Sequence, residues 1–383
     1  MQFAGQGVGT LVTTKMDLDV KRLSNDIKVL AIDTDSRHDK PAAAYAKVAA
    51  VVKRTAAAGV GAIYKKTDSA LRGNVGAELT AVYDGAGIKQ LPFVPAYPLN
   101  NRITVDGCQY VDGIPVHKTN MGRDIFSPVN SALIADIIHS QSEIPVAHKS
   151  PGEKPVDMRG ICVYNAASEE ELNSIGDELA GRGEINITAG CAGFARYLLK
   201  LLGLKVGGNT GKIRAGGGKT LLICGSINAV SMGQMSYLKQ KGCPVVTLYD
   251  YLDGEDFAGR AAKTAVDMLA HSDTVIVESL KEAVTLKEQG AAANGGRLAI
   301  VSAFARLTRK ILEGADVKTL FVIGGDTLRG IADEMNFDGI IPQTELAAGV
   351  VLGRVNGENL NIVSKSGGFG DGELVYKVLK ELK

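Results

Sequence analysis

Residues 60–82 have the sequence VGAIYKKTDSALRGNVGAELTAV, in which a polar run separates an apolar run from a helical pattern. The apolar run 60–64 predicts a buried strand, and Val75, Leu79 and Val82 recur at helical spacing after the polar run. The polar run therefore lies at the carboxyl end of a strand. Small ligands bind at that edge of a parallel sheet, so this stretch indicates both an α/β fold and a site.

The polar run 65–74, together with Glu78, contains three cations, two hydroxyls and two acids. Asn74 is predicted to be the N-cap of the following helix. Arg72 and free backbone N–H groups would then face one point, a ready site for a carboxylate or phosphate. A solvated, charged loop is the alternative, but such a loop has no need for Gly73 and Gly76 beside an Arg and an Asp.

The composition is typical of a globular protein with more than one domain. The 383 residues are 45% hydrophobic and 22% charged, and a domain usually holds about 100–200 residues. The 43 Lys+Arg and 42 Asp+Glu leave a formal net charge of +1. No global field attracts nucleic acid or an acidic membrane, so we expect neither as a partner, and any anion site must be local.

The cysteines and apolar runs predict a cytoplasmic protein. Cys108, Cys162, Cys191, Cys224 and Cys243 form no CxxC pair and lie mostly in apolar runs, as buried thiols in a reducing compartment do. No run approaches the ~18 apolar residues of a membrane span. The first five residues also lack a charged region that leads into an apolar core.

Short β-rich runs alternate with Ala-rich helical stretches, which predicts an α/β protein with two α/β domains and mainly parallel sheets. Strands are expected at 10–12, 29–32, 62–64, 91–94, 161–164, 221–223, 245–248, 275–277, 320–323 and 361–363. Helices are expected at 42–58, 169–180, 258–269, 303–312 and 374–382.

A glycine-dense polar segment separates the two halves. We expect domains at 1–205 and 218–383 and a linker at 206–217, because such sequence cannot build a core. Residues 213–220, IRAGGGKT, resemble a P-loop, but Ile213 stands where the first glycine must be. A predicted strand also follows where a P-loop needs a helix, so we reject that interpretation.

Three glycine turns in the second half follow predicted strands and precede helices, at 225–228, 324–327 and 364–370. Glycine lets backbone N–H groups approach an anion, and a hydroxyl or a Lys can complete the cradle. One such turn is weak evidence, because Gly often serves turn geometry alone. Three at equivalent ends of one sheet favour a nucleotide site. Asp326 suits Mg²⁺ or a ribose hydroxyl, and an exposed N-cap accounts for it equally well.

These motifs resemble those of the four-carbon acid sugar kinases, in the same order and over nearly the whole chain. The matching segments are KKTDSALRGN at 65–74 with Glu78, VPAYP at 94–98 with Arg102 and Thr104, GGDT at 324–327 and KSGGFG at 365–370. The resemblance implies ATP-dependent phosphorylation of threonate, erythronate or 3-oxo-tetronate. It also implies an N-terminal sugar-acid domain, a C-terminal ATP domain and an active-site cleft between the domains.

Charge and the resemblance together suggest roles for individual side chains. Arg72 offers a planar fork for the sugar-acid carboxylate, and Asp68 is our candidate to orient the accepting hydroxyl and take its proton. A salt bridge in which Asp68 merely orders Arg72 is an equally weighted alternative. The acidic pair that this family usually carries near its N-terminus could equally be the proton acceptor. The other substrate-side candidates are Lys65, Lys66, Ser69, Gly73, Arg102 and Asp124. The nucleotide-side candidates are Ser226, Gly324, Gly325, Asp326, Thr327, Lys365, Gly367 and Gly368.

Two of these candidates also have a structural explanation without a ligand. Arg102 could be a surface arginine in a Pro-rich loop, and Asp124 could be an acidic residue that belongs to a turn. ATP and Mg²⁺ are the expected cofactors, because phosphoryl transfer depends on positioning and on neutralising the phosphate charge. No separate protein metal site is expected. The small-molecule sugar acid and ATP are the expected partners, and a homodimer is left open.

One departure from the family concerns the beginning of the sequence. Such kinases typically open with a strand that ends in Asp-Asp-x-Thr-Gly-Ala and with a helix, whereas residues 1–7, MQFAGQG, resemble the end of that helix. We therefore expect a start codon placed too late, a truncated chain or a catalytically impaired protein. The alternative function is then a non-catalytic sugar-acid or nucleotide binding protein.

Overall fold

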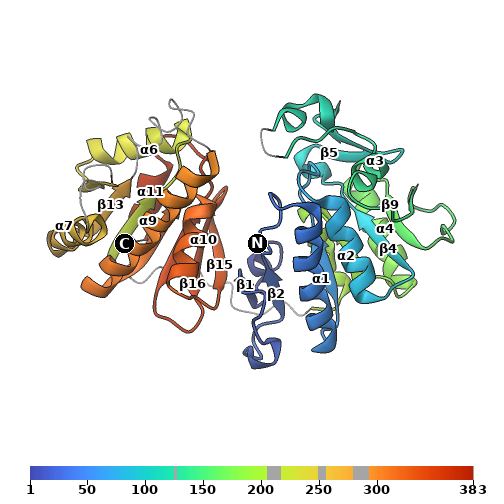
Figure 1. Cartoon of the computed structure of the whole chain (residues 1–383), viewed down its shortest axis with the longest axis horizontal. Helices are drawn as coiled ribbons and strands as arrows, with labels where there is room; N and C mark the ends of the chain where they lie inside the picture. The colour runs from blue at the N-terminus through green and yellow to red at the C-terminus, as the bar shows by residue number, and fades with distance from the viewer. Residues whose placement is uncertain (125–126, 205–216, 249–255, 279–292, 383) are drawn as a thin grey trace.

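The chain forms two α/β lobes that lie side by side (Figure 1). The structure is a computed structural model and describes residues 1–124, 127–204, 217–248, 256–278 and 293–382. The linker expected at 206–217 lies outside the described residues except for Gly217. The domain boundaries next to it therefore stay a prediction.

The larger sheet has nine strands, of which seven form the C lobe together with helices α6, α7, α9, α10 and α11, whereas the other two come from the N-terminal end of the chain and extend the sheet at one edge. Five strands at one end run parallel, β15 and β16 continue antiparallel, and the N-terminal strands β1 and β2 complete the other edge. In spatial order the strands are β12 (Val245–Thr247), β13 (Thr274–Glu278), β11 (Lys219–Cys224), β14 (Val317–Ile323), β17 (Asn361–Lys365), β16 (Val350–Val355), β15 (Ile340–Ala347), β1 (Thr10–Thr13) and β2 (Val29–Ile32).

The N lobe contains a five-stranded sheet in which every pairing is parallel. Its spatial order is β3 (Ile63–Lys66), β10 (Ile187–Gly190), β4 (Gln90–Val94), β9 (Gly160–Tyr164) and β8 (Val146–Lys149). A small antiparallel sheet lies beside it, with strands β5 (Arg102–Val105), β6 (Cys108–Val111) and β7 (Ile114–Pro115).

The helices begin and end at recognisable signals. For example, α4 starts in a capping box formed by Ser168 and Glu171, and α2 stops at Gly87, which has a left-handed φ of 63°. The N-lobe helices are α1 (Pro41–Ala57), α2 (Val75–Ala86), α3 (Ile134–His139), α4 (Glu169–Gly181) and α5 (Ala192–Leu201). The C-lobe helices are α6 (Ala229–Gln240), α7 (Phe257–His271), α9 (Ala293–Gly314), α10 (Gly325–Glu334) and α11 (Leu374–Glu381).

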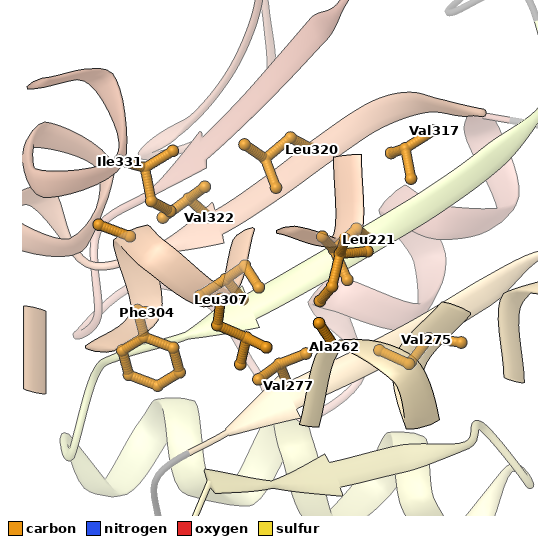
Figure 2. Close-up of a cluster of buried hydrophobic side chains, with 14 of the residues drawn as sticks. Leu221, Ala262, Val275, Val277, Phe304, Leu307, Val317, Leu320, Val322 and Ile331 are labelled. Carbon is orange, nitrogen blue, oxygen red and sulfur yellow. The ribbon is translucent and has the colours of Figure 1, made fainter. Parts of the chain in front are cut away.

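The core of the C lobe follows from the two-residue period of its strands. Along β11, Leu221 and Ile223 pack toward α7, α9 and α10, whereas Leu222 and Cys224 pack toward α6 and α11. Figure 2 shows the first of these clusters, where Leu221 lies among apolar side chains that come from neighbouring strands and from helices. Both faces of the sheet are therefore buried, as a parallel sheet requires.

The N lobe has the same layered design. Leu91 and Phe93 of β4 pack toward α1, α2 and α3, and Val94 packs toward α4 and α5. The strand carboxyl ends consequently share one edge, from which the β3–α2 loop emerges. Within the described residues, no helix is both long and apolar enough to cross a bilayer.

The α/β class with mainly parallel sheets is confirmed, and each expected strand and helix overlaps an observed one. The hairpin β15–β16 was not expected from the sequence. Every position of β15 is at least partly exposed, so it lacks the buried run or strict alternation that marks a strand. The placement of β1 and β2 also differs: although they belong to the first half of the chain, they extend the C-lobe sheet through Val12 and Ile340.

Candidate functional site

The β3–α2 loop has a backbone fixed by two left-handed residues. Leu71 has a φ of 61° and a side chain that is 1% exposed, and Gly73 has a φ of 91°. The left-handed conformation costs a leucine about 1–2 kcal/mol, whereas burial of its side chain contributes about 1.5–3 kcal/mol. The core contact of Leu71 therefore holds the loop and fixes the position of Arg72 between the two residues.

Arg72 is bound by two carboxylates. Its Nε donates to Asp68 Oδ2 at 2.9 Å and its Nη2 donates to Asp68 Oδ1 at 3.3 Å, which makes a bidentate pair. Its Nη1 donates to Asp124 Oδ2 at 3.4 Å. The salt bridge that the sequence left open for Asp68 is thus present, and Asp124 joins it from a segment about fifty residues away in the chain.

The protonation state of Asp68 follows from these contacts. Burial raises the pKa of the Asp68 carboxyl, but the hydrogen bonds and charge of Arg72, with the charge of Arg37, outweigh burial and bring the pKa below its ordinary value. The bond to Asp68 in turn raises the pKa of Arg72. Asp68 is therefore ionised at neutral pH, so it can orient a hydroxyl and accept its proton but has none to donate.

The loop after β2 also reaches this region, and the sequence analysis missed it. Ser36 Oγ donates to Glu78 Oε1 at 2.5 Å, and Arg37 Nη2 lies 3.7 Å from Asp68 Oδ1. The signal was available, because residues 33–39 follow a predicted strand in the same way as the β3–α2 loop does.

The start of α2 differs from the prediction. Asn74 stands at the N-cap position, but its side chain makes no capping bond and instead donates from Nδ2 to the Ser36 carbonyl at 2.7 Å. Gln141 Oε1 accepts from the backbone N–H groups of Gly76 at 2.9 Å and Ala77 at 3.3 Å. The expectation of free N–H groups for a ligand is therefore wrong for Gly76 and Ala77, because Gln141 occupies both.

The two lysines at the end of β3 differ in their surroundings. Lys65 Nζ pairs with Glu78 Oε2 at 2.7 Å, in a contact that is largely shielded from solvent. Lys66 is exposed, and in the part of the chain that the structure describes its side chain has no hydrogen bond or ion pair. Lys66 is thus the cation of this region that remains open to an incoming anion.

The other predicted substrate-side residues divide into two groups. A Cβ on Gly73 would lie 3.0 Å from Arg37 Cγ, so this glycine allows the two loops to meet. The Ser69 carbonyl accepts from Gln109 Nε2 at 3.0 Å, which ties the β3–α2 loop to β6. Arg102 bonds to the carbonyl of Asn100 and, among the described residues, shares no hydrogen bond or ion pair with Arg72 or Asp68.

The charged and polar side chains that these contacts bring together form what we call the N-lobe cluster. It is formed by the loops after β2 and β3, the start of α2 and one loop acid. Its members are Ser36, Arg37, Lys65, Asp68, Arg72, Glu78 and Asp124, and the exposed side chain of Lys66, which follows Lys65 in β3, has no hydrogen bond or ion pair to them among the described residues.

The three glycine turns of the C lobe lie level with one another. Cys224, Ile323 and Lys365 are the last residues of β11, β14 and β17, and the register pairs Cys224 with Ile323 and Ile323 with Lys365. Each turn begins one residue later, so the third begins at Ser366 and not at Ser364 as expected, because Ser364 and Lys365 belong to β17. The prediction that these turns share equivalent ends of one sheet is confirmed, and we call 225–228, 324–327 and 366–370 the C-lobe turns.

Close contacts between the C-lobe turns depend on the absence of side chains. A Cβ on Gly225 would lie 2.0 Å from Thr327 Oγ1, and a Cβ on Gly367 would lie 2.3 Å from Ser226 Oγ. Ser231 Oγ of α6 donates to the Gly367 carbonyl at 2.7 Å and holds the third turn in place. Glycine backbone and hydroxyl groups at a strand–helix junction are suited to bind phosphate, so these residues fit a nucleotide.

Lys365 and Asp326 take different places from those expected. Lys365 is 2% exposed, and its Nζ donates to the Ser366 carbonyl at 2.9 Å, so it braces its own turn from within. Burial lowers the pKa of this ammonium. Asp326 is exposed in the first turn of α10, but the N-cap is Gly324, so the N-cap explanation of Asp326 is wrong.

Within the described ranges, no group of three or more His, Cys, Asp or Glu side chains could hold a metal ion. A Mg²⁺ ion bound here would need ligands from elsewhere. Magnesium in such sites usually takes one or two carboxylates together with substrate phosphates and water. The exposed carboxylate of Asp326, beside the C-lobe turns, has the right chemistry to supply one protein ligand.

Two domain families match the sequence. Residues 1–198 match the family described as a sugar-binding N-terminal domain, and residues 221–375 match the family described as a nucleotide-binding C-terminal domain. The first family covers the N-lobe cluster, and the second covers the C-lobe turns.

Curated proteins that resemble the chain are kinases by name. A D-erythronate kinase of Heliobacterium modesticaldum is 26% identical, with 97% of this chain and 90% of the relative covered. A D-threonate kinase of Salmonella typhimurium is 28% identical, with 97% and 92% covered. A 3-oxo-tetronate kinase of Methylobacterium radiotolerans is 24% identical, with 82% and 78% covered.

Two solved structures share the fold over the whole chain. A Salmonella typhimurium protein titled a putative tRNA synthase has a TM-score of 0.81 at 17% identity, and a Haemophilus influenzae protein has a TM-score of 0.79 at 18% identity. Each alignment covers 100% of this chain and 96% of the other. This likeness supports the two-lobed α/β architecture.

Proposed function

The chain belongs to the four-carbon acid sugar kinase family, and we propose that it transfers the γ-phosphoryl group of ATP to a hydroxyl of a four-carbon sugar acid. Threonate, erythronate and 3-oxo-tetronate are the candidate acids, because the curated relatives are named for them. The observation that carries the proposal is the level alignment of three glycine turns at adjacent parallel strands.

In this proposal the C-lobe turns bind the phosphates of ATP. The backbone N–H groups of Gly225, Gly324 and Gly367 and the hydroxyls of Ser226 and Thr327 would donate to phosphate oxygens. Mg²⁺ bound with the nucleotide would neutralise charge on the transferred group. Lys365 would act indirectly, because its ammonium is buried beneath the third turn and bonds to that turn's backbone.

The N-lobe cluster and the neighbouring Lys66 together would have the charge that a sugar acid requires. Four cations against three carboxylates leave one positive charge, which matches the single negative charge of a four-carbon monoacid. Lys66 would meet the substrate carboxylate first, because it is exposed and unpaired within the described residues. The cations are Arg37, Lys65, Lys66 and Arg72, and the carboxylates are Asp68, Glu78 and Asp124.

Arg72 can still contribute to substrate binding although it is already paired. A guanidinium has five N–H groups, and three bonds of Arg72 go to Asp68 and Asp124. The remaining donors can reach a substrate oxygen, while the two acids hold the guanidinium plane in a fixed orientation. Fixed donors lose less conformational entropy on binding than mobile ones do.

Asp68 is our candidate to receive the proton of the attacking hydroxyl. It is ionised because Arg72 keeps its pKa below the ordinary value despite burial. In phosphoryl transfer little proton movement is needed before the transition state, so an ionised carboxylate that orients the hydroxyl is sufficient.

The proposal is tested by measuring ADP release from ATP with D-threonate, D-erythronate and 3-oxo-tetronate, one at a time, with product identification by mass spectrometry. We expect a phosphorylated acid with at least one of the three. Erythrose, which lacks the carboxylate, is the matched control and should be at least about tenfold poorer, because it leaves the cation cluster unpaired. A folded protein that binds ATP but phosphorylates none of the acids would contradict the proposal.

A further inference from the structure

We infer that the ion pair between Asp35 and Arg329 couples the two halves of the site, so that bound nucleotide increases the affinity for the sugar acid. The inference rests on the proposed function and concerns a positioning role. Arg329 Nη1 contacts Asp35 Oδ2, and this pair joins α10 of the C lobe to the loop after β2. Neither residue needs to touch a substrate for the coupling to operate.

The C-lobe end of this contact lies close to the proposed phosphate site. Helix α10 begins at Gly325 within the second C-lobe turn, and Arg329 follows four residues later, about 6 Å along the helix axis. Thr327, between them, is buried against Gly225 of the first turn. A phosphate that draws these turns together therefore acts on the same rigid helical turn that carries Arg329.

The N-lobe end of the contact lies next to the substrate cluster. Asp35 has a left-handed φ of 43°, and its backbone N–H donates to Asp33 Oδ1 at 2.9 Å, so the loop is locally fixed. The next two residues bond into the cluster: Ser36 donates to Glu78, and Arg37 lies beside Asp68. A shift of Asp35 therefore moves Arg37, which follows two residues later, and changes the contact of Arg37 with the Asp68 carboxylate.

The turn after β1 also contacts the C lobe. Thr14 Oγ1 donates to Asp333 Oδ1 at 3.1 Å, and Asp333 Oδ2 lies 3.6 Å from Arg329 Nε, so this contact reaches Arg329, whereas the contacts of Lys15 do not. Lys15 Nζ bonds to Asp338 Oδ1 at 2.7 Å and to the Asn336 carbonyl at 3.0 Å. Lys15 lies outside the loop 33–39, and Asp338 lies beyond the end of α10. This second ion pair joins the same two regions and so provides a matched control for loss of an ion pair alone.

Coupling of this kind is reciprocal, because a nucleotide that improves acid binding by some factor is itself bound more tightly by the same factor when the acid is present. The side chains are 31% exposed for Arg329 and 54% exposed for Asp35. Pairs this exposed are weak, so we expect the coupling to be about threefold to fivefold.

The test measures the dissociation constant of the accepted sugar acid with and without AMP-PNP by isothermal titration calorimetry. The variants are D35N, which retains the left-handed backbone that Asn tolerates, R329M, the double variant D35N/R329M, R329K and the control K15M. We expect a wild-type ratio of about three to five, which K15M keeps. D35N, R329M and the double variant should all bring the ratio close to one, and R329K should restore part of it.

Several results would overturn the inference: a wild-type ratio of one, a ratio unchanged in D35N and R329M, or a ratio that falls equally in K15M. Equal loss in K15M would mean that general contact between the lobes, and not this pair, carries the effect. Failure of the proposed function is seen in a different measurement, because the folded wild-type protein would then phosphorylate none of the three acids, whatever the ratio of dissociation constants is.

Discussion

The N-lobe cluster and the C-lobe turns both lie at the carboxyl ends of parallel strands, yet they are built from different groups. The N-lobe cluster consists of charged side chains such as Arg72 and Asp68, which neutralise one another. The C-lobe turns consist largely of glycine backbone, and Gly225 lies so close to Thr327 that a Cβ at position 225 would be 2.0 Å from Thr327 Oγ1. The first design depends on charge and the second on empty space, so different substitutions should disable each.

The largest effect is expected from Arg72→Ala. It removes the partner of two carboxylates and the donors proposed for the substrate, and hydrogen bonds to charged groups are worth about 1.5–3 kcal/mol each. We expect kcat/KM for the sugar acid to fall about 100-fold, while the dissociation constant of ATP measured without the acid stays unchanged. Steady-state kinetics and calorimetry check the two parts.

Arg22→Ala is the control for this change. Arg22 also pairs with an aspartate nearby in sequence, Asp19, but its side chain is 87% exposed, so its loss should leave kcat/KM unchanged. If Arg72→Ala weakened ATP binding as strongly as turnover of the acid, the proposal that the N-lobe cluster binds the acid and the C-lobe turns bind the nucleotide would be wrong.

The next effect is expected from Gly225→Ala. The new Cβ would lie 2.0 Å from Thr327 Oγ1, so the first and second C-lobe turns must move apart. Overpacking of this kind costs about 1–3 kcal/mol, and we expect ATP to bind about tenfold to 100-fold more weakly while the sugar acid binds as before. Calorimetric titration with each ligand separates the two effects.

Gly233→Ala is the matched control in α6, because a Cβ there has no atom within 4 Å. It should leave ATP binding unchanged and raise the free energy of unfolding by about 0.5–1 kcal/mol, since alanine favours a helix. Equal ATP affinity in wild type and Gly225→Ala would show that the nucleotide does not use the contact between the first two turns.

A smaller effect concerns the acid side of the stability profile. The pKa of Asp68 lies below its ordinary value of 3.8, so its ionisation stabilises the fold fully above that value, and the stabilisation is lost as pH falls through the lower, folded pKa. In Arg72→Ala the effect of burial on Asp68 is no longer outweighed by Arg72, so the pKa of the Asp68 carboxyl should rise. Denaturation by urea across pH 3 to 7 should then show stability lost at higher pH than in the wild type. An unchanged profile would mean that another cation holds Asp68.

The smallest effect is expected from Gln141→Ala. This change leaves backbone N–H groups of the N lobe without a side-chain partner, as is proposed for the glycine turns of the C lobe. The change frees the N–H groups of Gly76 and Ala77 at the start of α2, and loss of a helix cap costs about 1 kcal/mol. Urea denaturation should show this decrease, whereas the exposed Gln240→Ala should stay within about 0.5 kcal/mol of wild type. A decrease no larger than that of Gln240→Ala would show that Gln141 is no effective cap.

The strands and helices were predictable wherever burial repeats with a clear period. Along β11 the run from Leu221 to Cys224 is buried at every position, which is the pattern of a central parallel strand. The pairing of β1 with β15 was not predictable in this way. It depends on which sheet edge is free in three dimensions, and the local sequence around Val12 carries no record of that edge.

The candidate site was predictable where it follows a strand end, and much less so where it depends on contacts distant in sequence. Lys66, Asp68 and Arg72 were found from the strand–loop–helix pattern, and the same pattern after β2 would have found Arg37. Gln141 could not have been found, because no periodic signal connects it with α2, and only the packing of α3 against α2 brings its side chain to the helix start.

The most direct test of the central claim, that the two halves serve a single phosphoryl transfer, is a phosphorus NMR spectrum of the protein incubated with ATP, Mg²⁺ and each four-carbon acid. We predict a phosphomonoester signal of the sugar acid that grows as the γ-phosphate signal declines and is strongly reduced in both Arg72→Ala and Gly225→Ala. If the wild-type protein binds ATP and the acid yet forms no phosphomonoester, or forms it equally well in both variants, the claim is contradicted.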